Sequence, residues 1–394
     1  MSADPRTLAG AELAEALRDS RAVTLARTFD LPEWPVPDRA GVNRVDWELG
    51  HLAWFAEFWI LRGPHAASAD GRFSEASQPA RIAGPDAVFD SSRLAHADRW
   101  RTDMPSREAL AARLETQLAA CIEAIPSASD DDSALYFHRL ALFHEDMHGE
   151  AFAWLRSTLG WPAPAGLEAM PVLRSAGGPL RIDGDSVVLG QALGAPGFAF
   201  DNEQPGPVIR VAPFEIDAQP VSVGEFQSFV DAGGYDRADL WPGEAGRWRA
   251  ARGLAHPERW SRTADGPWQA RWFDRTAPLD PDAPLVHVNA FEAEAWCRWH
   301  GRRLPSAAEW GLAARDPRFH WGGSVWEWTA DAFLPYPDFE PGPYRDYSAP
   351  WFGDHRELKG GSFATHARLH DPRYRNFFTP DRHDVFAGFR SVTR

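Results

Sequence analysis

Apolar residues recur at helical spacing through the first 165 residues of the chain. The repeat is clear in four segments, residues 11–29, 46–62, 107–125 and 133–159, and it gives each segment one apolar face. Polar loops that contain proline join these segments. Four amphipathic helices with such connections favour a four-helix bundle, and the Pro/Gly-rich stretch near residues 160–172 is typical of a linker.

The pattern changes after this linker. Short β-like runs occupy residues 186–190, 208–217 and 284–289, and helical spacing returns only around residues 223–234 and 290–301. Long irregular loops separate these elements, and such loops in a compact domain are usually functional. Because 394 residues are too many for one ordinary core, we predict an α+β protein with two domains, residues 1–165 and residues 166–394.

Composition and charge narrow the choice of partners. The chain is 44% hydrophobic and 25% charged, a globular profile, and its net charge of -15 argues against nucleic acid or an anionic membrane as the main partner. We find no stretch of the roughly 20 apolar residues that span a bilayer, and the first residues lack the apolar core of a signal peptide. We therefore expect a cytoplasmic protein that acts on small molecules.

Cysteine and tryptophan usage adds two constraints. Cys121 and Cys297 are the two cysteines, too few for a disulfide framework or a four-thiolate zinc site, and this scarcity fits a reducing compartment. The 19 tryptophans suit walls that recognise a quaternary ammonium group, although any single tryptophan is better explained as core.

Three histidines form the main candidate site. His144 and His148 are four residues apart in a helical segment, so they share one face with Cβ atoms about 5–6 Å apart. His51 lies in another helical segment, with aromatic residues three, four and seven positions after it. A single histidine on an apolar face is more often a core residue, but three histidines from two helices are how helical bundles build metal sites.

The metal at such a site could be zinc or iron. A carboxylate from Asp146 or Glu150 could replace one imidazole, but each lies two residues from His148 and so points off the shared face. Three imidazoles are the simpler ligand set. Glu145, Asp146 and Glu150 are then expected to be solvated or to orient the imidazoles.

Five segments of the second half match one known fold as a set. Residues 219–235, 287–315, 322–333, 358–365 and 386–392 resemble the formylglycine-generating-enzyme fold, which is a C-type-lectin-like domain. Formylglycine generation in that family uses a pair of cysteines near the C-terminus. Cys297 is the only cysteine in this half, so that activity is not expected here.

Taken with "GH" at residues 50–51 and "HEDMH" at residues 144–148, the whole chain resembles the ergothioneine-type sulfoxide synthases. In these proteins a DinB-like four-helix bundle is fused to the formylglycine-generating-enzyme-like domain. The resemblance implies that His51, His144 and His148 bind Fe(II). It also implies that the enzyme uses O2 to join a sulfur nucleophile to C2 of hercynine, the trimethylated betaine of histidine.

The resemblance also implies residues that bind the substrates. The segment 374–382 matches the part of the family that contacts hercynine, and this places Asn376 and Phe377 against hercynine with Phe378 nearby. The alternative explanation for both phenylalanines is that they belong to the core.

The chain departs from the branch of the family that uses γ-glutamylcysteine. His96 and Arg99 stand where that branch has two arginines, although Arg93 could compensate. Met147 stands in place of a glutamine and Phe378 in place of an aspartate that grips the amine of the donor. A pocket with fewer charges suits a charged dipeptide less well. We therefore favour the selenoneine synthase branch, which uses a selenosugar, over cysteine or γ-glutamylcysteine as the donor.

The family's sulfur branch uses a tyrosine as proton donor, in the loop before "GGSF". The candidates here are Tyr344 and Tyr347, with Tyr336 as a third, while Phe339 falls nearest to the expected position. Without a proton donor, the outcome with a thiol would shift from bond formation to oxidation of the sulfur. The alternative is that these tyrosines only pack the loop.

Two other classes of function remain open at this stage. One is a zinc-dependent thiol transferase built on the DinB-like bundle, and the other is a lectin-like binding module with a vestigial bundle, since a fold alone does not define a function. Metal analysis and the effect of replacing His148 distinguish them from the iron enzyme. The sequence gives no prediction of the oligomeric state.

Overall fold

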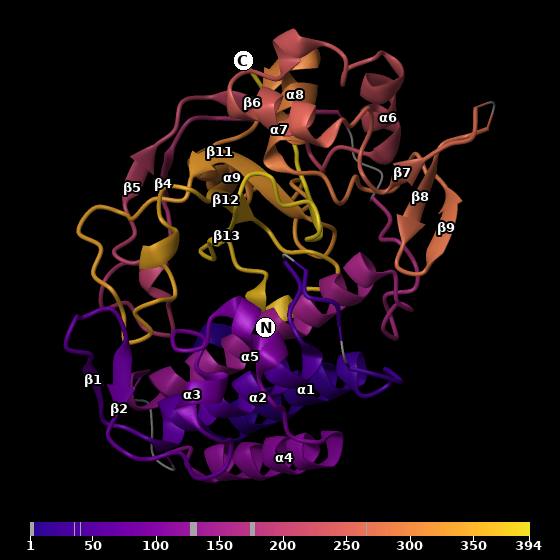
Figure 1. Ribbon diagram of the computed structural model, residues 1–394. Coiled ribbons are helices and arrows are strands. Elements are labelled where there is room, and N and C mark those ends of the chain that lie inside the picture. The colour runs from indigo at the N-terminus through magenta and orange to yellow at the C-terminus, as the bar shows by residue number, and fades with distance from the viewer. Residues whose placement is uncertain (1–3, 35, 40, 127–131, 174–177, 265) are drawn as a thin grey trace. The chain divides into compact units, whose positions relative to one another are not determined.

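The chain folds into two units, and each unit is built from three separate stretches of the sequence. The computed structural model describes residues 4–34, 36–39, 41–126, 132–173, 178–264 and 266–394 (Figure 1). The first unit comprises Met1–Leu155, Gly194–Asp201 and Glu340–Pro350, and the second comprises Arg156–Leu193, Asn202–Phe339 and Trp351–Arg394. A single boundary at residue 165 therefore does not describe the two units.

The later segments join the first unit through specific contacts. The backbone N–H of Gly197 donates to the Asp132 carboxylate at 2.8 Å, and the Tyr347 hydroxyl lies 3.7 Å from the Met147 sulfur. The Ser348 hydroxyl donates to Asp201 at 2.5 Å, which ties the two returning segments to each other. These are single polar contacts without periodicity, so no hydrophobic pattern in the sequence predicts them.

All four long helices predicted for the first half are present in the structure. Their bounds are α1 Gly10–Thr28, α2 Val45–Ala56, α4 Arg107–Glu123 and α5 Asp132–Leu159. A π-helical turn, Glu57–Leu61, continues α2, and the short elements are α3 Asp86–Phe89, β1 His65–Ala67 and β2 Ser74–Ala76. The resemblance of this helical unit to DinB proteins stays a prediction.

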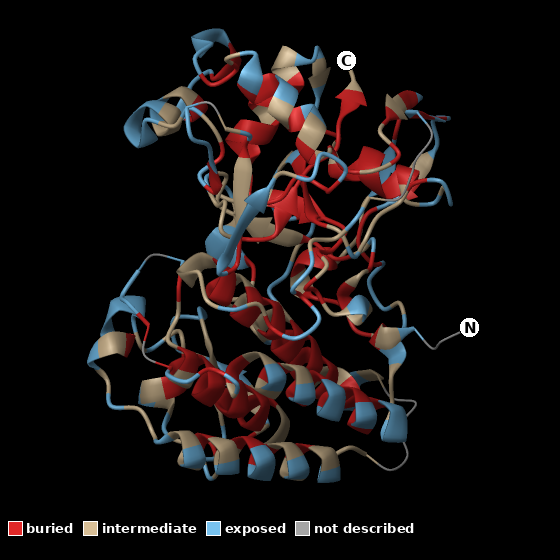
Figure 2. Ribbon diagram, turned by 90° about the vertical axis from the view of Figure 1, so that its right-hand side faces the viewer, coloured by how far each residue is buried: buried red, intermediate tan, exposed pale blue. Residues whose placement is uncertain are grey.

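Each helix buries the apolar stripe that its sequence gives it. Helix α4 buries Leu110, Leu114, Gln117 and Cys121, a spacing of three or four residues that keeps one face inward, and Figure 2 shows the opposite side of this helix exposed. The Ser106 hydroxyl accepts from the backbone N–H of Ala109 and so caps the start of α4. This packing holds the helices on which the candidate site lies.

The second unit contains short strands and short helices. Its helices are α6 Val223–Asp231, α7 Glu244–Arg252, α8 Ala290–Trp299 and α9 Ala307–Ala313. Its strands are β3 Leu180–Ile182, β4 Ser186–Val188, β5 Val208–Arg210, β6 Phe214–Ile216, β7 Trp260–Ser261, β8 Gln269–Trp272, β9 Arg275–Pro278, β10 Arg302–Arg303, β11 Trp326–Ala332, β12 Arg356–Lys359, β13 Asn376–Phe378, β14 Ala387–Gly388 and β15 Val392–Thr393.

The strands of this unit form small sheets. One sheet has the order β10-β15-β6-β3, a second has the order β13-β12-β11-β14, and β4-β5 and β7-β8-β9 are antiparallel ribbons. Strand β11 pairs antiparallel with β12 and parallel with β14. The strand predicted at residues 186–190 and both predicted helices are present. The run predicted at residues 208–217 forms two strands, β5 and β6, which belong to different sheets.

One predicted strand is wrong. Residues 284–289 lie outside the named strands and contribute a single bridge, from Pro284 to Ser222. Backbone geometry explains the difference, because His287 has a φ of 63°, which interrupts an extended strand. Asn289 then caps α8 by accepting from the backbone N–H of Glu292, so the apolar run leads into a helix.

Buried ion pairs cross the interior of the second unit. Arg390 and Glu327 are fully buried and lie 2.5 Å apart, and the Trp310 indole N–H donates to the same carboxylate at 2.7 Å. Arg375 lies 2.9 Å from Glu357. Paired in this way, buried charges avoid the large desolvation penalty of an isolated ion. Among the helices of the described residues, none is both long and apolar enough to cross a membrane.

Candidate metal centre

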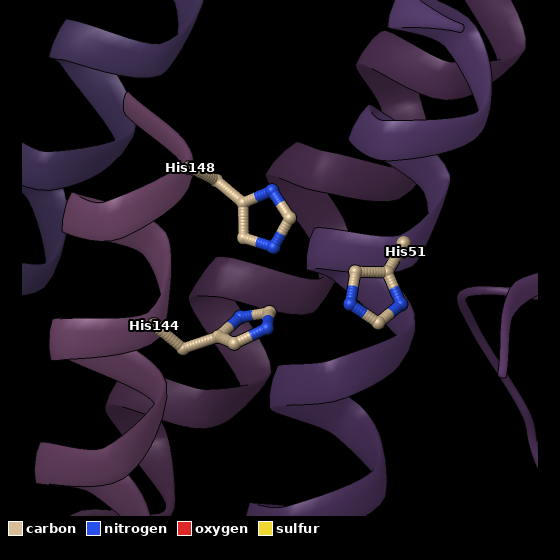
Figure 3. A group of neighbouring side chains, drawn as sticks. All are labelled: His51, His144 and His148. Atoms are coloured by element: carbon tan, nitrogen blue, oxygen red, sulfur yellow. The ribbon is translucent and has the colours of Figure 1, made fainter. Parts of the chain in front are cut away.

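Three imidazoles from two helices converge within the first unit. His51 lies on α2 and His144 and His148 lie on α5, and Figure 3 shows the three rings turned toward one another. One nitrogen of each ring lies within 4.8 Å of one nitrogen of each of the others. This spacing fits three ligands of a single metal ion, so the arrangement predicted for the three histidines is the one found.

Hydrogen bonds to the outer nitrogens fix the tautomers of two rings. The Nδ1 atom of His51 lies 2.8 Å from the carbonyl oxygen of Phe89, and Nδ1 of His148 lies 2.5 Å from a carboxylate oxygen of Glu48. Both partners only accept hydrogen bonds, so each Nδ1 carries a proton and each Nε2 keeps its lone pair free. A carboxylate or carbonyl in this position is the usual partner of a metal-binding histidine.

Burial keeps the imidazoles of His51 and His144 neutral. Burial is the main cause that lowers the pKa of His51 to about 3, and the neighbouring His148 is the second. Burial also lowers the pKa of His144 well below its ordinary value. Only an uncharged imidazole can donate its lone pair to a metal. The three nitrogen donors and the neutral state of His51 and His144 therefore fit a divalent transition metal such as iron or zinc.

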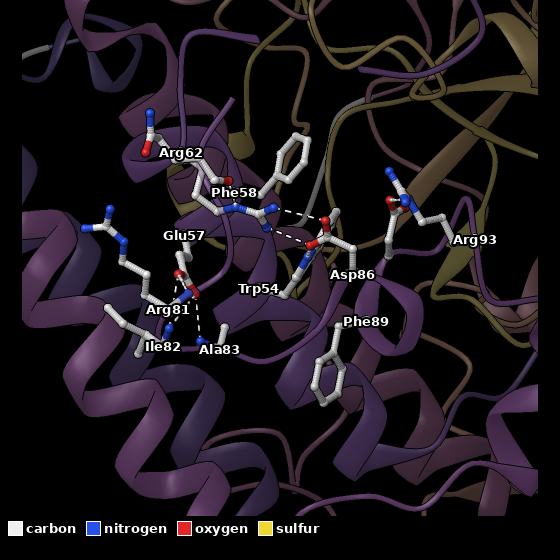
Figure 4. Close-up of polar contacts among 12 residues, drawn as sticks. Trp54, Glu57, Phe58, Arg62, Arg81, Ile82, Ala83, Asp86, Phe89 and Arg93 are labelled. Atoms are coloured by element: carbon white, nitrogen blue, oxygen red, sulfur yellow. Dashed lines mark hydrogen bonds and ion pairs between the residues drawn. The ribbon is translucent and has the colours of Figure 1, made fainter. Parts of the chain in front are cut away.

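The loop that supplies the Phe89 carbonyl is fastened to the ligand helix (Figure 4). The carboxylate of Glu57 accepts from the backbone N–H groups of Arg81, Ile82 and Ala83, with the shortest distances at 2.6 Å. A few residues further on, Arg62 lies 2.7 Å from Asp86 in a two-bonded ion pair. These bonds hold the loop so that the Phe89 carbonyl meets His51.

Gly50 makes the close approach of this loop possible. A Cβ atom added at Gly50 would lie 2.1 Å from Cε1 of Phe89, well inside van der Waals contact. The residue directly before His51 must therefore be glycine for the Phe89 ring to pack on α2 and bring its carbonyl to the imidazole. The "GH" pair at residues 50–51 has a steric cause.

The acidic residues beside the α5 histidines are not solvated, which contradicts the first of the two predicted alternatives. Glu145, Asp146 and Glu150 are buried rather than solvated. Glu145 pairs with Arg21 of α1 at 2.6 Å, and Asp146 accepts from the Ser20 hydroxyl at 2.8 Å. Glu48 of α2 bonds to the imidazole of His148 at 2.5 Å. Sequence analysis missed this residue, although its place three positions before His51 puts both on one face of α2.

A small cavity of about 20 Å³ opens beside His51. Its aromatic lining consists of Trp54, Phe55, Phe58, Trp59, Phe73 and Tyr344, and its polar lining consists of Ser74, Asp90, Ser91, Ser92 and Asp346. All of these residues belong to the first unit. A cavity of this size has room for about one water molecule.

The residues predicted to bind the donor lie near α2 and α5. Arg93 pairs with Asp90 at 3.1 Å, and Nε2 of His96 lies 2.9 Å from the carbonyl of Val42. Arg99 donates to Asn43 at 2.8 Å and stacks over Trp47, with its guanidinium carbon 3.6 Å from the ring centroid. The Trp47 ring in turn stacks on His51, with centroids 4.9 Å apart. Met147 contacts Tyr347, as described above.

Of the three candidate proton donors, Tyr344 lies nearest the histidines. Its ring centroid is 6.3 Å from that of His144 and 5.0 Å from that of Phe55. Burial is the main cause that raises the pKa of Tyr344 well above its ordinary value, and the negative charge of Asp346 is the second. The Tyr344 hydroxyl therefore stays protonated. Tyr347 lies one ring further away, 5.6 Å from Tyr344, and Tyr336 packs in the core of the second unit.

The residues predicted to bind hercynine lie on an edge strand of the second unit. Asn376, Phe377 and Phe378 form β13, which pairs with β12, and all three are partly exposed. Phe377 stacks on Phe333 with ring centroids 4.0 Å apart. Their role in binding hercynine stays a prediction. Phe339, beside the expected tyrosine position, packs edge-on against Phe352.

Comparison with known proteins first defines the class of the second unit. Residues 167–324 and 319–394 match the family model "Sulfatase-modifying factor enzyme 1-like domain", which confirms the predicted formylglycine-generating-enzyme fold. A formylglycine-generating enzyme from Streptomyces coelicolor is 29% identical over 58% of this chain and 91% of its own length. Cys121 and Cys297 are both buried and unpaired, and they lie in different units.

Two further relatives span almost the whole chain. A hercynine oxygenase from Mycolicibacterium thermoresistibile is 31% identical over 96% of this chain and 94% of its own length. Another, from Mycolicibacterium smegmatis, is 30% identical over 95% of this chain and 98% of its own length. The chain belongs to the ergothioneine-type sulfoxide synthase family.

Proposed function

We propose that this protein is an Fe(II)- and O2-dependent enzyme that forms a bond between C2 of the hercynine imidazole and a selenium or sulfur nucleophile. The observation that carries the proposal is the convergence of three imidazoles from α2 and α5, in a chain whose full-length relatives are hercynine oxygenases. Hercynine is accordingly the proposed acceptor substrate.

His51, His144 and His148 would hold the iron, which when bound supplies O2 activation and a position for the chalcogen nucleophile. With a thiol, the sulfoxide reaction consumes one thiol, one hercynine C2–H and one O2, and it releases the sulfoxide and one water. Three imidazoles carry no charge, so an anionic thiolate or selenolate is favoured beside the metal. Tyr344 is the proposed proton donor, because it is protonated and close to His144.

We propose the selenosugar as the preferred donor. The γ-glutamylcysteine branch binds its substrate with arginines. Here Arg99 stacks on Trp47 and donates to Asn43. Arg93 forms an ion pair with Asp90. Met147 and Phe378 take the places of further polar groups. Cysteine and γ-glutamylcysteine are the alternative donors.

Anaerobic reconstitution with Fe(II) tests this proposal. Hercynine and O2 are added together with a selenosugar, cysteine or γ-glutamylcysteine, and the product mass and O2 uptake are recorded. We expect a C2-linked selenium product with the selenosugar at the highest kcat/KM. A higher kcat/KM with either thiol would reject the selenium donor and keep the family reaction, and the absence of any hercynine product would reject the reaction itself.

A zinc-dependent thiol transferase is the second candidate, since three converging imidazoles suit zinc equally well. It needs no O2. The metal content of the protein as purified, compared with O2 uptake after reconstitution with iron or zinc, separates the two: turnover with zinc in the absence of O2 would favour the transferase.

A further inference from the structure

The second unit contains a cavity of its own beside the ribbon β7-β8-β9, which Figure 1 labels. Its volume is about 270 Å³, just below the usual range of small-molecule sites, roughly 300–1,000 Å³. This volume suits a ligand with a single substituted ring. All the residues that line the cavity belong to the second unit, whereas the three converging histidines belong to the first.

Paired positions of the ribbon form one wall of this cavity. The lining residues at these positions are Trp260, Ala270, Trp272, Arg275 and Ala277. Residues directly opposite each other on neighbouring strands share one face of the ribbon. Ala270 lies opposite Ala277, and these two small side chains leave space that larger ones would fill. The two tryptophans are buried and supply a flat aromatic surface for a ligand ring.

His287 lines the same cavity and has an unused hydrogen-bond acceptor. The residue is buried, and its Nδ1 atom lies 3.2 Å from the carbonyl oxygen of His383. A carbonyl only accepts, so Nδ1 carries the proton and Nε2 keeps its lone pair. Nε2 has no hydrogen-bond partner among the described residues. A buried acceptor that stays unpaired is costly, and a hydroxyl or N–H group of a ligand would remove this cost.

Two further properties of His287 fit a binding role. Its φ of 63° lies in the left-handed region, which is uncommon for a residue with a side chain and recurs at ligand sites. Burial is the main cause that lowers the pKa of His287 well below its ordinary value, and the charge of Arg259 is the second. The ring therefore stays neutral, and Nε2 remains an acceptor at physiological pH.

Positive charge predominates around the cavity. Arg259, Arg271 and Arg275 line it together with Glu168 and Asp280, so three cations stand against two carboxylates. Arg259 and Arg271 both donate to the backbone at the end of α5. The guanidinium of Arg275 is exposed and forms no ion pair among the described residues. Arg275 is thus the cation that can pair with an anionic group of a ligand.

We propose that this cavity binds a small aromatic acid whose ring carries a hydroxyl or N–H group. The ring lies against the tryptophans, the hydroxyl or N–H donates to Nε2 of His287, and the acid group pairs with Arg275. This site goes beyond the proposed function and does not depend on it, because none of its lining residues belongs to the three-histidine cluster.

Three related probes test the assignment on the full-length protein, with and without Fe(II), by equilibrium dialysis under anaerobic conditions. 4-Hydroxyphenylacetate has both proposed groups, phenylacetate lacks the hydroxyl, and tyramine carries an ammonium group in place of the carboxylate. We expect a dissociation constant of about 1 mM or lower for 4-hydroxyphenylacetate. The constants for phenylacetate and tyramine should be at least about 10-fold higher.

Each of the other outcomes overturns one part of the proposal. Equal binding of 4-hydroxyphenylacetate and phenylacetate would remove the role of His287 as acceptor, and equal binding of tyramine would remove the role of Arg275. No binding of 4-hydroxyphenylacetate would reject the site. Because no turnover is measured, failure of binding leaves the proposed function standing, and failure of the hercynine reaction leaves this site standing.

Variants of the ribbon locate the bound probe. Ala277→Phe places a large ring in the cavity, and it should raise the dissociation constant of 4-hydroxyphenylacetate at least about 10-fold. Thr276→Phe is the matched control, because Thr276 is the neighbouring residue of β9 and points to the opposite face. His148→Ala should bind the probe as the wild type does. An equal loss in Ala277→Phe and Thr276→Phe, or a loss in His148→Ala, would place the probe elsewhere and overturn the proposal.

Discussion

Two groups of buried polar side chains, one in each unit, differ in how many of their polar atoms are bonded within the protein. In the second unit, Arg390 and Glu327 neutralise each other, and the Trp310 indole N–H completes the set. In the first unit, His51 and His148 each use one nitrogen in a hydrogen bond and keep the other free. A saturated cluster stabilises the fold, whereas a cluster with free lone pairs facing one point is available for a ligand.

Replacing His148 with alanine should have the largest effect. Loss of one of three ligands should remove most of the bound iron and lower turnover on the order of 10³-fold, because metal catalysis contributes several kcal/mol. Metal content after dialysis and kcat with hercynine measure the two effects. His138→Ala is the matched control: His138 is also a buried histidine of α5, and it bonds to the Cys121 carbonyl, so its loss should spare the metal. Full iron content in His148→Ala would contradict the assigned ligand set.

Breaking the saturated cluster should instead affect stability. Arg390→Met leaves the Glu327 carboxylate buried without its cation, which typically costs about 3–5 kcal/mol. We expect a clearly lower denaturant midpoint, measured by tryptophan fluorescence. Arg303→Met, at a half-exposed ion pair with Glu309, should change the midpoint far less. Equal midpoints for the two variants would show that the buried pair is not the stabilising element.

Glu48→Gln should have a smaller effect than the two variants above. We expect it to weaken metal binding and to leave the stability of the fold unchanged. The amide oxygen can still accept from Nδ1 of His148, but the negative charge that strengthens this imidazole as a ligand is lost. Such changes typically weaken metal affinity by about 10- to 100-fold. Competition with a chelator of known affinity measures it. Glu145→Gln, at a buried carboxylate that pairs with Arg21, should leave the affinity unchanged. A similar loss in both variants would remove the special role of Glu48.

The smallest expected effect concerns a partly exposed pair of the second unit. The hydrogen bond from His383, 2.7 Å away, lowers the pKa of Glu258 to about 2. Burial lowers the pKa of His383, but the bond to Glu258 together with the negative charges of Glu258 and Glu292 outweighs burial and raises this pKa. The depressed Glu258 stabilises the fold above pH 4.5 and loses this effect toward pH 2. The raised His383 stabilises it below pH 6.5 and loses this effect at higher pH.

The pair should therefore contribute most between pH 4.5 and pH 6.5. Thermal unfolding of His383→Gln and wild type across pH 4–9 should show the largest difference inside this window and a smaller one above pH 7. A difference that grows at alkaline pH would contradict the assignment.

The sequence predicted what depends on periodicity, and it missed what depends on single contacts. Helical spacing located α1, α2, α4 and α5, and the shared face of His144 and His148 pointed to the site. The strand predicted at residues 284–289 was wrong because the left-handed backbone of His287 interrupts it. Helix α9 was missed, although Ser306 and Glu309 form a capping box at its start.

The surroundings of the histidines were less predictable for the same reason. Phe89 lies 38 residues after His51 in the sequence, and Glu48 lies 100 residues before His148. Asp346 lies in the segment Glu340–Pro350, which returns to the first unit. The Phe89 carbonyl and Asp346 follow no periodic pattern, whereas Glu48 lies one helical turn before His51 on the same face of α2. Gly50 was a second usable signal, since a glycine inside an otherwise apolar helix indicates a close approach of another chain segment.

The return of residues Glu340–Pro350 to the helical unit has a consequence for protein engineering. This one segment carries both Tyr344 and Asp346, whereas the three converging histidines belong to helices that lie earlier in the sequence. Exchanging the segment with that of a sulfur-using relative would transplant part of the wall beside His51 and leave the helices that carry the histidines intact. Conversely, an excised piece ending at residue 165 would lack this wall.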